Sequence, residues 1–216
     1  MDVINVLGFA IGMIGFIYAF YSDHKRKKER IHRQQRFEWG HVQQGVKQIC
    51  NWIKQDKFNP DFLLAVPGAG IILTELASIE LGEGMPIYIV QQTPVQQSPF
   101  QQSKTSHALS GLEIKTSKWH YFIPQDIFTH KKKDTKVLII DDYAQSGDTL
   151  YEIKNTLVAN GFKSENIKTA SLITLKGLVE SSKNPDYSWF FVDTYDVHMP
   201  WGHASKKVRT GRLKPL

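Results

Sequence analysis

The chain has 216 residues, of which 41% are hydrophobic and 22% charged, and its formal net charge is +6. This length suits one α/β domain with short additions, and the apolar content excludes a disordered chain. The single cysteine, Cys50, excludes a disulfide framework and a cysteine-rich zinc site, and it fits a reducing compartment. A positive excess first suggests a nucleic-acid-binding protein, but that interpretation depends on where the charge lies.

The positive charge lies in the two terminal segments. Residues 1–36 hold seven Lys or Arg and three acids, and residues 203–216 hold five basic residues and no acid. The body between them, residues 37–202, holds 15 basic and 18 acidic residues. Because the body is mildly acidic, nucleic acid is not the expected partner, and the basic C-terminal tail (203–216) suits anionic lipid headgroups better.

The first segment has the pattern of a membrane anchor. Val3 to Tyr21 form an apolar run that is long enough to span the hydrocarbon core of a bilayer. Every Lys or Arg of this segment follows the run, whereas a signal peptide carries its positive charge before it. The sequence therefore predicts a single-pass anchor over 1–22 in the cell membrane, with the N-terminus outside and a basic linker over 23–36. Gly8 and Gly12 have the small-xxx-small spacing that would favour a homodimer.

Beyond the linker, helical and strand patterns alternate. The predicted helices cover residues 36–55, 71–81 and 149–160. The predicted strands cover residues 62–66, 86–90, 119–123, 136–142, 167–174 and 190–192. Residues 91–118 contain six glutamines and two prolines with little periodicity, which predicts a long loop and a candidate lid. The alternation predicts an α/β domain over 37–202 with a parallel sheet covered on both faces, and it shows no further domain boundary.

The segment VLIIDDYAQSGDTL, residues 137–150, carries the clearest chemistry. Asp141 and Asp142 follow a buried apolar strand, at the edge where ligands bind in open α/β sheets. The small and polar residues Ala144 to Thr149 then lead into a helix, whose N-terminus and backbone N–H groups favour an anion. Carboxylates can accept hydrogen bonds from a sugar diol or hold Mg²⁺. Together, a phosphate cradle and diol-binding acids predict a site for a ribose 5-phosphate group.

At this motif the sequence resembles the type I phosphoribosyltransferases, whose hallmark is an apolar strand, two adjacent acids and a Thr-Gly or Ser-Gly phosphate loop. The segment FNPDFLLAVPGAGIILTELA (58–77) is similar to the family's pyrophosphate-binding block. The segment KNPDYSWFFVDTYDVHMPWG (183–202) resembles the C-terminal part of the bacterial xanthine/guanine-type members. The resemblance covers about residues 37–202 and implies a parallel-sheet phosphoribosyltransferase fold with a small hood.

The resemblance also implies roles for individual residues. Asp141 and Asp142 would bind the ribose hydroxyls of phosphoribosyl pyrophosphate (PRPP), directly or through Mg²⁺, and the stretch of residues 92–118 would be the lid. The 5′-phosphate would be bound by Ala144, Ser146, Gly147, Asp148 and Thr149. The pyrophosphate loop would be Pro67, Gly68, Ala69 and Gly70. The base would be bound by Lys176, Tyr195 and Val197.

Two positions depart from the family pattern. Gln145 stands where the xanthine/guanine-type members have an Asp that acts on purine N7, and an amide cannot exchange a proton at neutral pH. The loop Pro67-Gly68-Ala69-Gly70 lacks the family's basic residue. Two functions therefore stay open. The first is Mg²⁺-dependent transfer from PRPP to a nucleobase, with Gln145 at the catalytic position. The alternative is a catalytically altered domain that acts as a membrane-tethered nucleotide or PRPP sensor or effector.

Overall fold

The computed structural model describes residues 35–94, 111–116, 119–129, 134–194 and 197–203. Two compact units are present: residues 38–195 form one, and the two ends of the chain, residues 1–37 and 196–216, are grouped in the other. The sequence pattern indicated no boundary within 37–202, because the segments of the smaller unit are far apart in the chain.

A parallel sheet of five strands forms the centre of the larger unit. Its order is β3-β2-β7-β8-β9, and every neighbouring pair is parallel. The strands are β2 (Phe62–Ala65), β3 (Ile87–Ile89), β7 (Val137–Ala144), β8 (Ile167–Leu175) and β9 (Tyr187–Val192). The four residues of β2 are all buried, as a strand covered on both faces requires. The predicted α/β architecture with a parallel central sheet is confirmed.

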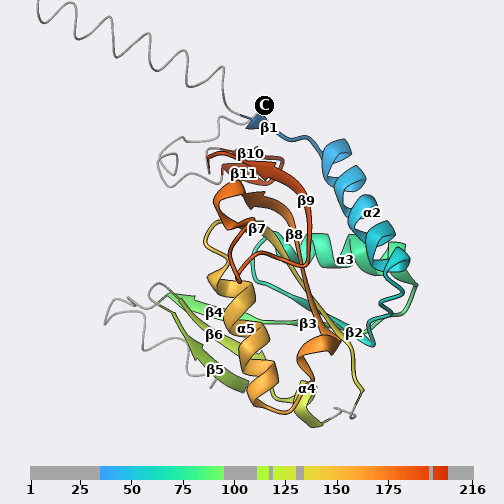
Figure 1. Cartoon of the computed structure of the whole chain (residues 1–216), viewed down its shortest axis with the longest axis vertical. Coiled ribbons are helices and arrows are strands. Elements are labelled where there is room, and N and C mark those ends of the chain that lie inside the picture. The colour runs from blue at the N-terminus through green and yellow to red at the C-terminus, as the bar shows by residue number, and fades with distance from the viewer. Residues whose placement is uncertain (1–34, 95–110, 117–118, 130–133, 195–196, 204–216) are drawn as a thin grey trace, which may run out of the picture. The chain divides into compact units, whose positions relative to one another are not determined.

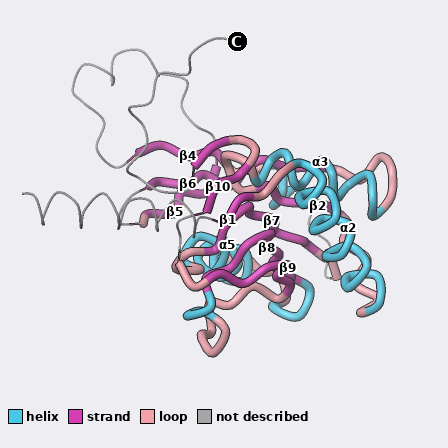
Figure 2. The backbone as a smooth tube through the Cα atoms, turned by 90° about the horizontal axis from the view of Figure 1, so that it is seen from above, coloured by secondary structure: helices cyan, strands magenta, loops and turns pink. Residues whose placement is uncertain are grey.

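Helices cover both faces of this sheet (Figure 1). Alternate strand residues such as Leu138 and Ala170 line one small apolar cavity with residues of α2 (Trp39–Gln55) and α3 (Gly70–Leu81). Their neighbours Val137 and Ile139 share a buried cluster with residues of α5 (Asp148–Ala159) on the opposite face. Figure 2 shows α2 and α3 beside each other, and the Cys50 thiol of α2 donates to the Ala77 carbonyl oxygen of α3.

A second, antiparallel sheet lies where the sequence predicted mainly a loop. It consists of β4 (Gln91–Pro94), β5 (Gly111–Lys115) and β6 (Trp119–Pro124), with β6 in the middle. The prediction of one loop over 91–118 was therefore wrong at both of its ends. The strands were missed because Gln91 and Gln92 lack apolar alternation, whereas backbone pairing with β6 satisfies their peptide groups. Ile114, Tyr121 and Ile123 attach this sheet to the buried cluster around α5.

Three short helices complete the larger unit: α4 (Asp126–Thr129), η1 (Ser164–Asn166) and η2 (Lys176–Leu178). In the smaller unit, β1 (Gln35–Arg36) pairs in parallel with β10 (Val197–Met199), which pairs in antiparallel with β11 (Gly202–His203). Within the residues described, no helix combines the length and apolar character needed to cross a bilayer. The predicted anchor (1–22), most of the basic linker (23–36) and all but the first residue of the basic tail (203–216) lie outside the described residues.

Candidate functional site

The acidic pair lies near the C-terminal end of β7, in the middle of the central sheet. Strand β7 continues past both acids to Ala144, two residues beyond the predicted end. Asp141 is 8% exposed, and its Oδ1 accepts a hydrogen bond from the Asp142 backbone N–H at 2.8 Å. Burial raises the pKa of Asp141 well above its ordinary value, and the adjacent Asp142 carboxylate acts in the same direction. The buried carboxyl of Asp141 therefore holds a proton more strongly than an exposed aspartate does, and a nearby cation or hydrogen-bond donor would favour its charged form.

The residues after β7 form a tight turn into α5. Gly147 precedes the helix with φ of +70°, in the left-handed region, and a Cβ there would overlap the carbonyl oxygen of Lys183. Ser146 donates from its hydroxyl to Asp148 Oδ2 at 2.7 Å. The turn brings this short polar loop to the N-terminus of a 12-residue helix, where backbone N–H groups lack partners within the helix.

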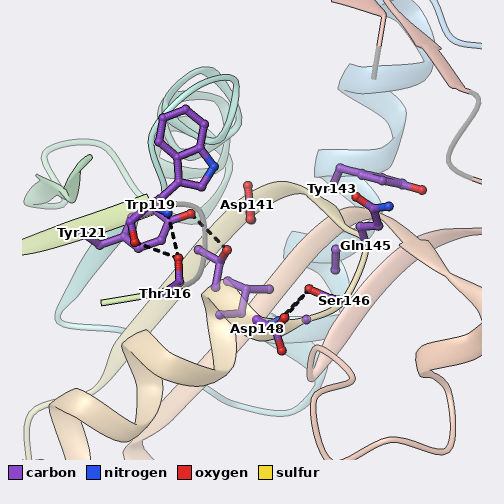
Figure 3. Close-up of a pocket in the computed structure, with 12 residues that line it drawn as sticks. Thr116, Trp119, Tyr121, Asp141, Tyr143, Gln145, Ser146 and Asp148 are labelled. Atoms are coloured by element: carbon purple, nitrogen blue, oxygen red, sulfur yellow. Dashed lines mark hydrogen bonds between the residues drawn. The ribbon is translucent and has the colours of Figure 1, made fainter. Parts of the chain in front are cut away.

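Aromatic residues of β6 form the opposite wall of the same pocket. The Tyr121 hydroxyl and Thr149 Oγ1 are 3.3 Å apart and share a hydrogen bond, and the Trp119 side chain stands beside them (Figure 3). Burial raises the pKa of Tyr121, and Asp141 adds to this effect, so its hydroxyl stays protonated. The pocket has a volume of about 210 Å³. It is lined by Thr116, Trp119, Tyr121, Asp141, Tyr143, Ala144, Gln145, Ser146, Gly147, Asp148, Thr149 and Leu150.

The end of β7 is held in place by a fully buried serine of the neighbouring strand. Ser171 Oγ accepts a hydrogen bond from the Ala144 backbone N–H at 3.1 Å and donates to the Ile173 carbonyl oxygen at 2.7 Å. These bonds satisfy the backbone where β7 leaves the regular ladder and turns into the phosphate loop. The position of the loop thus depends on β8 as well as on its own sequence.

The predicted pyrophosphate loop packs against the same strand end. The Val66 backbone N–H donates to the Ile140 carbonyl oxygen, and a Cβ on Gly70 would lie 3.4 Å from the Asp141 Cα. Gly68 has φ of +100°, with open space where a Cβ would lie. Residues 67–70 are thus next to the acidic pair, although they do not line the 210 Å³ pocket.

Of the predicted base-binding residues, Lys176 does not line this pocket. Lys176 lies in η2 and pairs with Asp193, with 2.9 Å between Lys176 Nζ and Asp193 Oδ1. Tyr195 lies outside the described residues, and Val197 is buried in β10 of the smaller unit. The role of these three residues therefore stays a prediction.

The donor set suits Mg²⁺ only as an ion shared with a ligand. In the described part of the chain, no group of three or more His, Cys, Asp and Glu side chains could enclose a metal ion. Mg²⁺ commonly binds through one or two carboxylates together with substrate phosphates and water, and Asp141 and Asp142 are of that kind. The suppressed charge of Asp141 is consistent with a carboxyl that gains from a nearby cation.

Sequence reasoning missed several residues of this region, namely Trp119, Tyr121, Ser171 and Lys183. Each comes from a segment distant from the 137–150 motif, so local spacing carried no signal for it. The run Trp119 to Ile123 was expected to be a strand, and its alternation would have placed Trp119 and Tyr121 on one face. No pattern in the sequence points to Lys183.

The fold and the pocket define an α/β protein whose central strand ends in two acids and a phosphate-type loop at a helix N-terminus. Residues 32–208 match the model of the phosphoribosyl transferase domain, and the chain belongs to this family. No curated protein sequence matched the chain.

Solved structures share the fold at low sequence identity. A purine phosphoribosyltransferase from Pyrococcus horikoshii OT3 is 22% identical, with a TM-score of 0.55 over 78% of this chain and 93% of that one. A xanthine-guanine-hypoxanthine phosphoribosyltransferase from Helicobacter pylori is 14% identical, with a TM-score of 0.54 over 79% and 94%. A hypothetical protein from Neisseria gonorrhoeae with bound ppGpp is 19% identical, with a TM-score of 0.58 over 79% and 90%.

Proposed function

We propose that this protein transfers ribose 5-phosphate from PRPP to a nucleobase or a related acceptor, with Mg²⁺, at the cytoplasmic face of the cell membrane. The observation that carries the proposal is the single pocket that joins Asp141 to the loop residues Gln145 to Thr149. Membership of the phosphoribosyl transferase domain family and the purine phosphoribosyltransferases among the structural neighbours support it.

The residues that line the pocket would bind different parts of PRPP in this reaction. The backbone N–H groups of residues 145–149 and the N-terminus of α5 bind the 5′-phosphate, and Ser146 and Thr149 are hydroxyl donors within the same loop. Asp141 and Asp142 accept hydrogen bonds from the ribose 2′- and 3′-hydroxyls. Bound Mg²⁺ would be held by these carboxylates and by the pyrophosphate, whose charge it neutralises.

The acids also act on the transition state. Positive charge develops at the ribose ring as the bond to pyrophosphate breaks, as in other oxocarbenium-like reactions. Carboxylates already fixed by the end of β7 stabilise that charge without reorganising. Trp119 and Tyr121 contribute an apolar wall, which helps to exclude water from the sugar.

A second function is favoured by one specific position. Gln145 is exposed and lines the pocket, where it cannot act as a general acid. A domain that retains the phosphate loop but lacks this acid suits a membrane-tethered sensor of nucleotides or PRPP. The ppGpp-bound neighbour shows that a protein of this fold can hold a guanine nucleotide.

Turnover distinguishes the two functions. The full chain, in detergent, is incubated with PRPP, Mg²⁺ and a panel of purine and pyrimidine bases, and pyrophosphate release is followed. The proposed transferase releases pyrophosphate with at least one base, and Asp141→Ala with Asp142→Ala abolishes the release. Ligand binding without turnover on any base would leave the sensor function.

The variant Gln145→Asp, with Gln145→Asn as its matched control, tests whether an acid at position 145 increases transfer. A positioned general acid or base contributes about 10²- to 10⁴-fold, so we expect Gln145→Asp to raise transfer to a 6-oxopurine by at least roughly tenfold. Gln145→Asn keeps an amide and should leave the rate within about twofold. An equal response of both variants would contradict an acid–base role at position 145.

The membrane anchor is a separate part of the proposal and rests on the apolar run from Val3 to Tyr21 and the basic residues after it. The full chain should remain in the membrane pellet after a carbonate wash. Replacing Ile11 and Ile14 by Arg should release it, because charges at the centre of a spanning helix oppose insertion by about 2.5–3.5 kcal/mol each. A full chain that is washed off the membrane would contradict the anchor.

A further inference from the structure

The phosphate loop carries an acid of its own. Asp148 is the first residue of α5, and its carboxylate lies between two donors. Its Oδ2 accepts the Ser146 hydroxyl at 2.7 Å, as Figure 3 shows, and its Oδ1 accepts Lys183 Nζ at 2.6 Å. Asp148 also lines the pocket, so its charge lies at the place assigned to a phosphate.

An acid at this place works against a phosphorylated ligand. The helix N-terminus favours any nearby anion, so a carboxylate on the first residue competes with the ligand for the same dipole. It also repels a phosphate that carries about two negative charges at neutral pH. The loop can bind a phosphate well only if the charge of Asp148 is neutralised from within the protein.

Lys183 supplies that neutralising charge from a distant part of the chain, the connection between β8 and β9. Its backbone packs against the loop, because its carbonyl oxygen lies 2.3 Å from the position that a Cβ of Gly147 would take. Its backbone N–H donates to Ser181 Oγ at 3.2 Å, and its Nζ lies 5.5 Å from the Tyr151 ring centroid. The two backbone contacts fix the position of Lys183, and the Tyr151 ring lies close to its ammonium group while that group donates to Asp148. The hydrogen bond that Lys183 donates to the Asp148 carboxylate raises the pKa of Lys183, which keeps the lysine charged.

We propose that Lys183 is a positioning residue of the phosphate site, which neutralises and holds the Asp148 carboxylate so that the loop accepts a phosphorylated ligand. Lys183 does not line the pocket, and it acts through Asp148 rather than on the phosphate. The inference rests on the proposed function, because it assumes that the ligand places a phosphate at residues 145–149.

The test is a double-mutant cycle on the full chain, with ribose 5-phosphate as the ligand and calorimetric titration as the measurement. Lys183→Met leaves the Asp148 charge uncompensated and should weaken binding by on the order of tenfold. Asp148→Asn removes the charge and should tighten binding severalfold. In the double variant no Asp148 charge is left to neutralise, so the loss of Lys183 should have no further effect on binding. The affinity of the double variant should therefore equal that of Asp148→Asn within about twofold. Lys183→Arg should keep most of the wild-type affinity.

Lys163 offers a matched control. Its side chain is 38% exposed, as is that of Lys183, and its Nζ lies 2.6 Å from Asp134 Oδ1. That pair is outside the pocket, so Lys163→Met should leave the affinity unchanged. Thermal unfolding of every variant separates a loss of affinity from a loss of folding.

The outcomes separate this inference from the proposed function. A wild-type protein that binds neither ribose 5-phosphate nor PRPP overturns both. Wild-type binding together with equal affinities of Lys183→Met and Lys163→Met overturns the inference alone. A tenfold loss in Lys183→Met that persists in the Asp148→Asn background also overturns it, because Lys183 would then act on the phosphate directly.

Discussion

Replacing Asp141 by Asn should make the protein more stable while it abolishes ligand binding. The substitution keeps the shape of the side chain and keeps Oδ1 as an acceptor for the Asp142 backbone N–H, which is 2.8 Å away. It removes a carboxylate that is 8% exposed and adjacent to the carboxylate of Asp142. The new amide N–H can donate to Asp142, so no buried donor is left unsatisfied.

The size of the gain follows from the charge that is removed. Two unit charges about 5 Å apart repel by about 3 kcal/mol at an effective dielectric constant of 20, and burial of the carboxylate adds to that penalty. Proton uptake by the wild-type pair limits the penalty, so we expect the free energy of unfolding to rise by about 1–3 kcal/mol. For a chain of this length the corresponding rise in Tm is about 2–12 °C.

The gain should depend on pH in a defined direction. The folded state raises the pKa of Asp141 above its ordinary value of 3.8, so the folded protein binds this proton more tightly than the unfolded chain does. As pH rises through 3.8 the unfolded chain ionises first, and the wild type loses stability until the folded pKa is passed. Asn does not titrate, so its advantage should be small below pH 3.8 and reach a plateau at higher pH.

Thermal unfolding of the full chain from pH 3.5 to 8, followed by near-ultraviolet circular dichroism, measures this advantage. The control is Asp193→Asn, whose side chain is 78% exposed and which should change stability by less than about 0.5 kcal/mol. A variant Asp141→Asn that is less stable than the wild type at pH 8 would refute the reasoning. An advantage that does not shrink with falling pH would refute it as well.

Three further predictions concern the loop, the cysteine and the wall of the pocket. Gly147→Ala should lower the free energy of unfolding by about 2 kcal/mol or more, because φ at Gly147 is +70° and the added Cβ would meet the backbone of Lys183. The same change should abolish ribose 5-phosphate binding. In a thermal melt the control is Gly177→Ala, because the space around a Cβ at Gly177 is open. Burial raises the pKa of the Cys50 thiol to about 12, so a disulfide reagent should label it at pH 8 only after unfolding, and rapid labelling of the folded protein would contradict this. Trp119→Phe should remove the change in tryptophan fluorescence caused by nucleotide binding, whereas Trp189→Phe should retain it, because Trp119 lines the pocket and Trp189 is not among its lining residues.

The part of the fold that could be predicted is the part whose signal is local. The continuous apolar run before Asp141 predicts a buried strand, and the polar turn after it predicts a helix N-terminus. Both patterns come from burial on two faces and from helix geometry, and they depend little on the rest of the chain.

The parts of the fold and of the pocket that the sequence did not predict depend on contacts between distant segments. Gln91 and Gln92 become strand residues because β6 supplies partners for their backbone groups. Lys183 reaches Asp148 across a separation of 35 residues. Neither the β4–β6 pairing nor the Lys183–Asp148 ion pair produces a periodic pattern or a fixed spacing in the sequence. Local patterns therefore predict the 137–150 motif, whereas the other walls of the pocket depend on tertiary contacts.

The strand order has a consequence for how the protein folds. Strand β7 pairs with β8 and β8 pairs with β9, the next strand in the chain each time. In contrast, Phe62 of β2 pairs with Val137 of β7, roughly 75 residues later. Closing so large a loop is slower than local pairing, so we expect β2 to join β7 late. The Pro67 to Gly70 loop follows β2, and the acidic pair belongs to β7. A ligand that contacts both would therefore stabilise the last pairing to form and would slow the first step of unfolding.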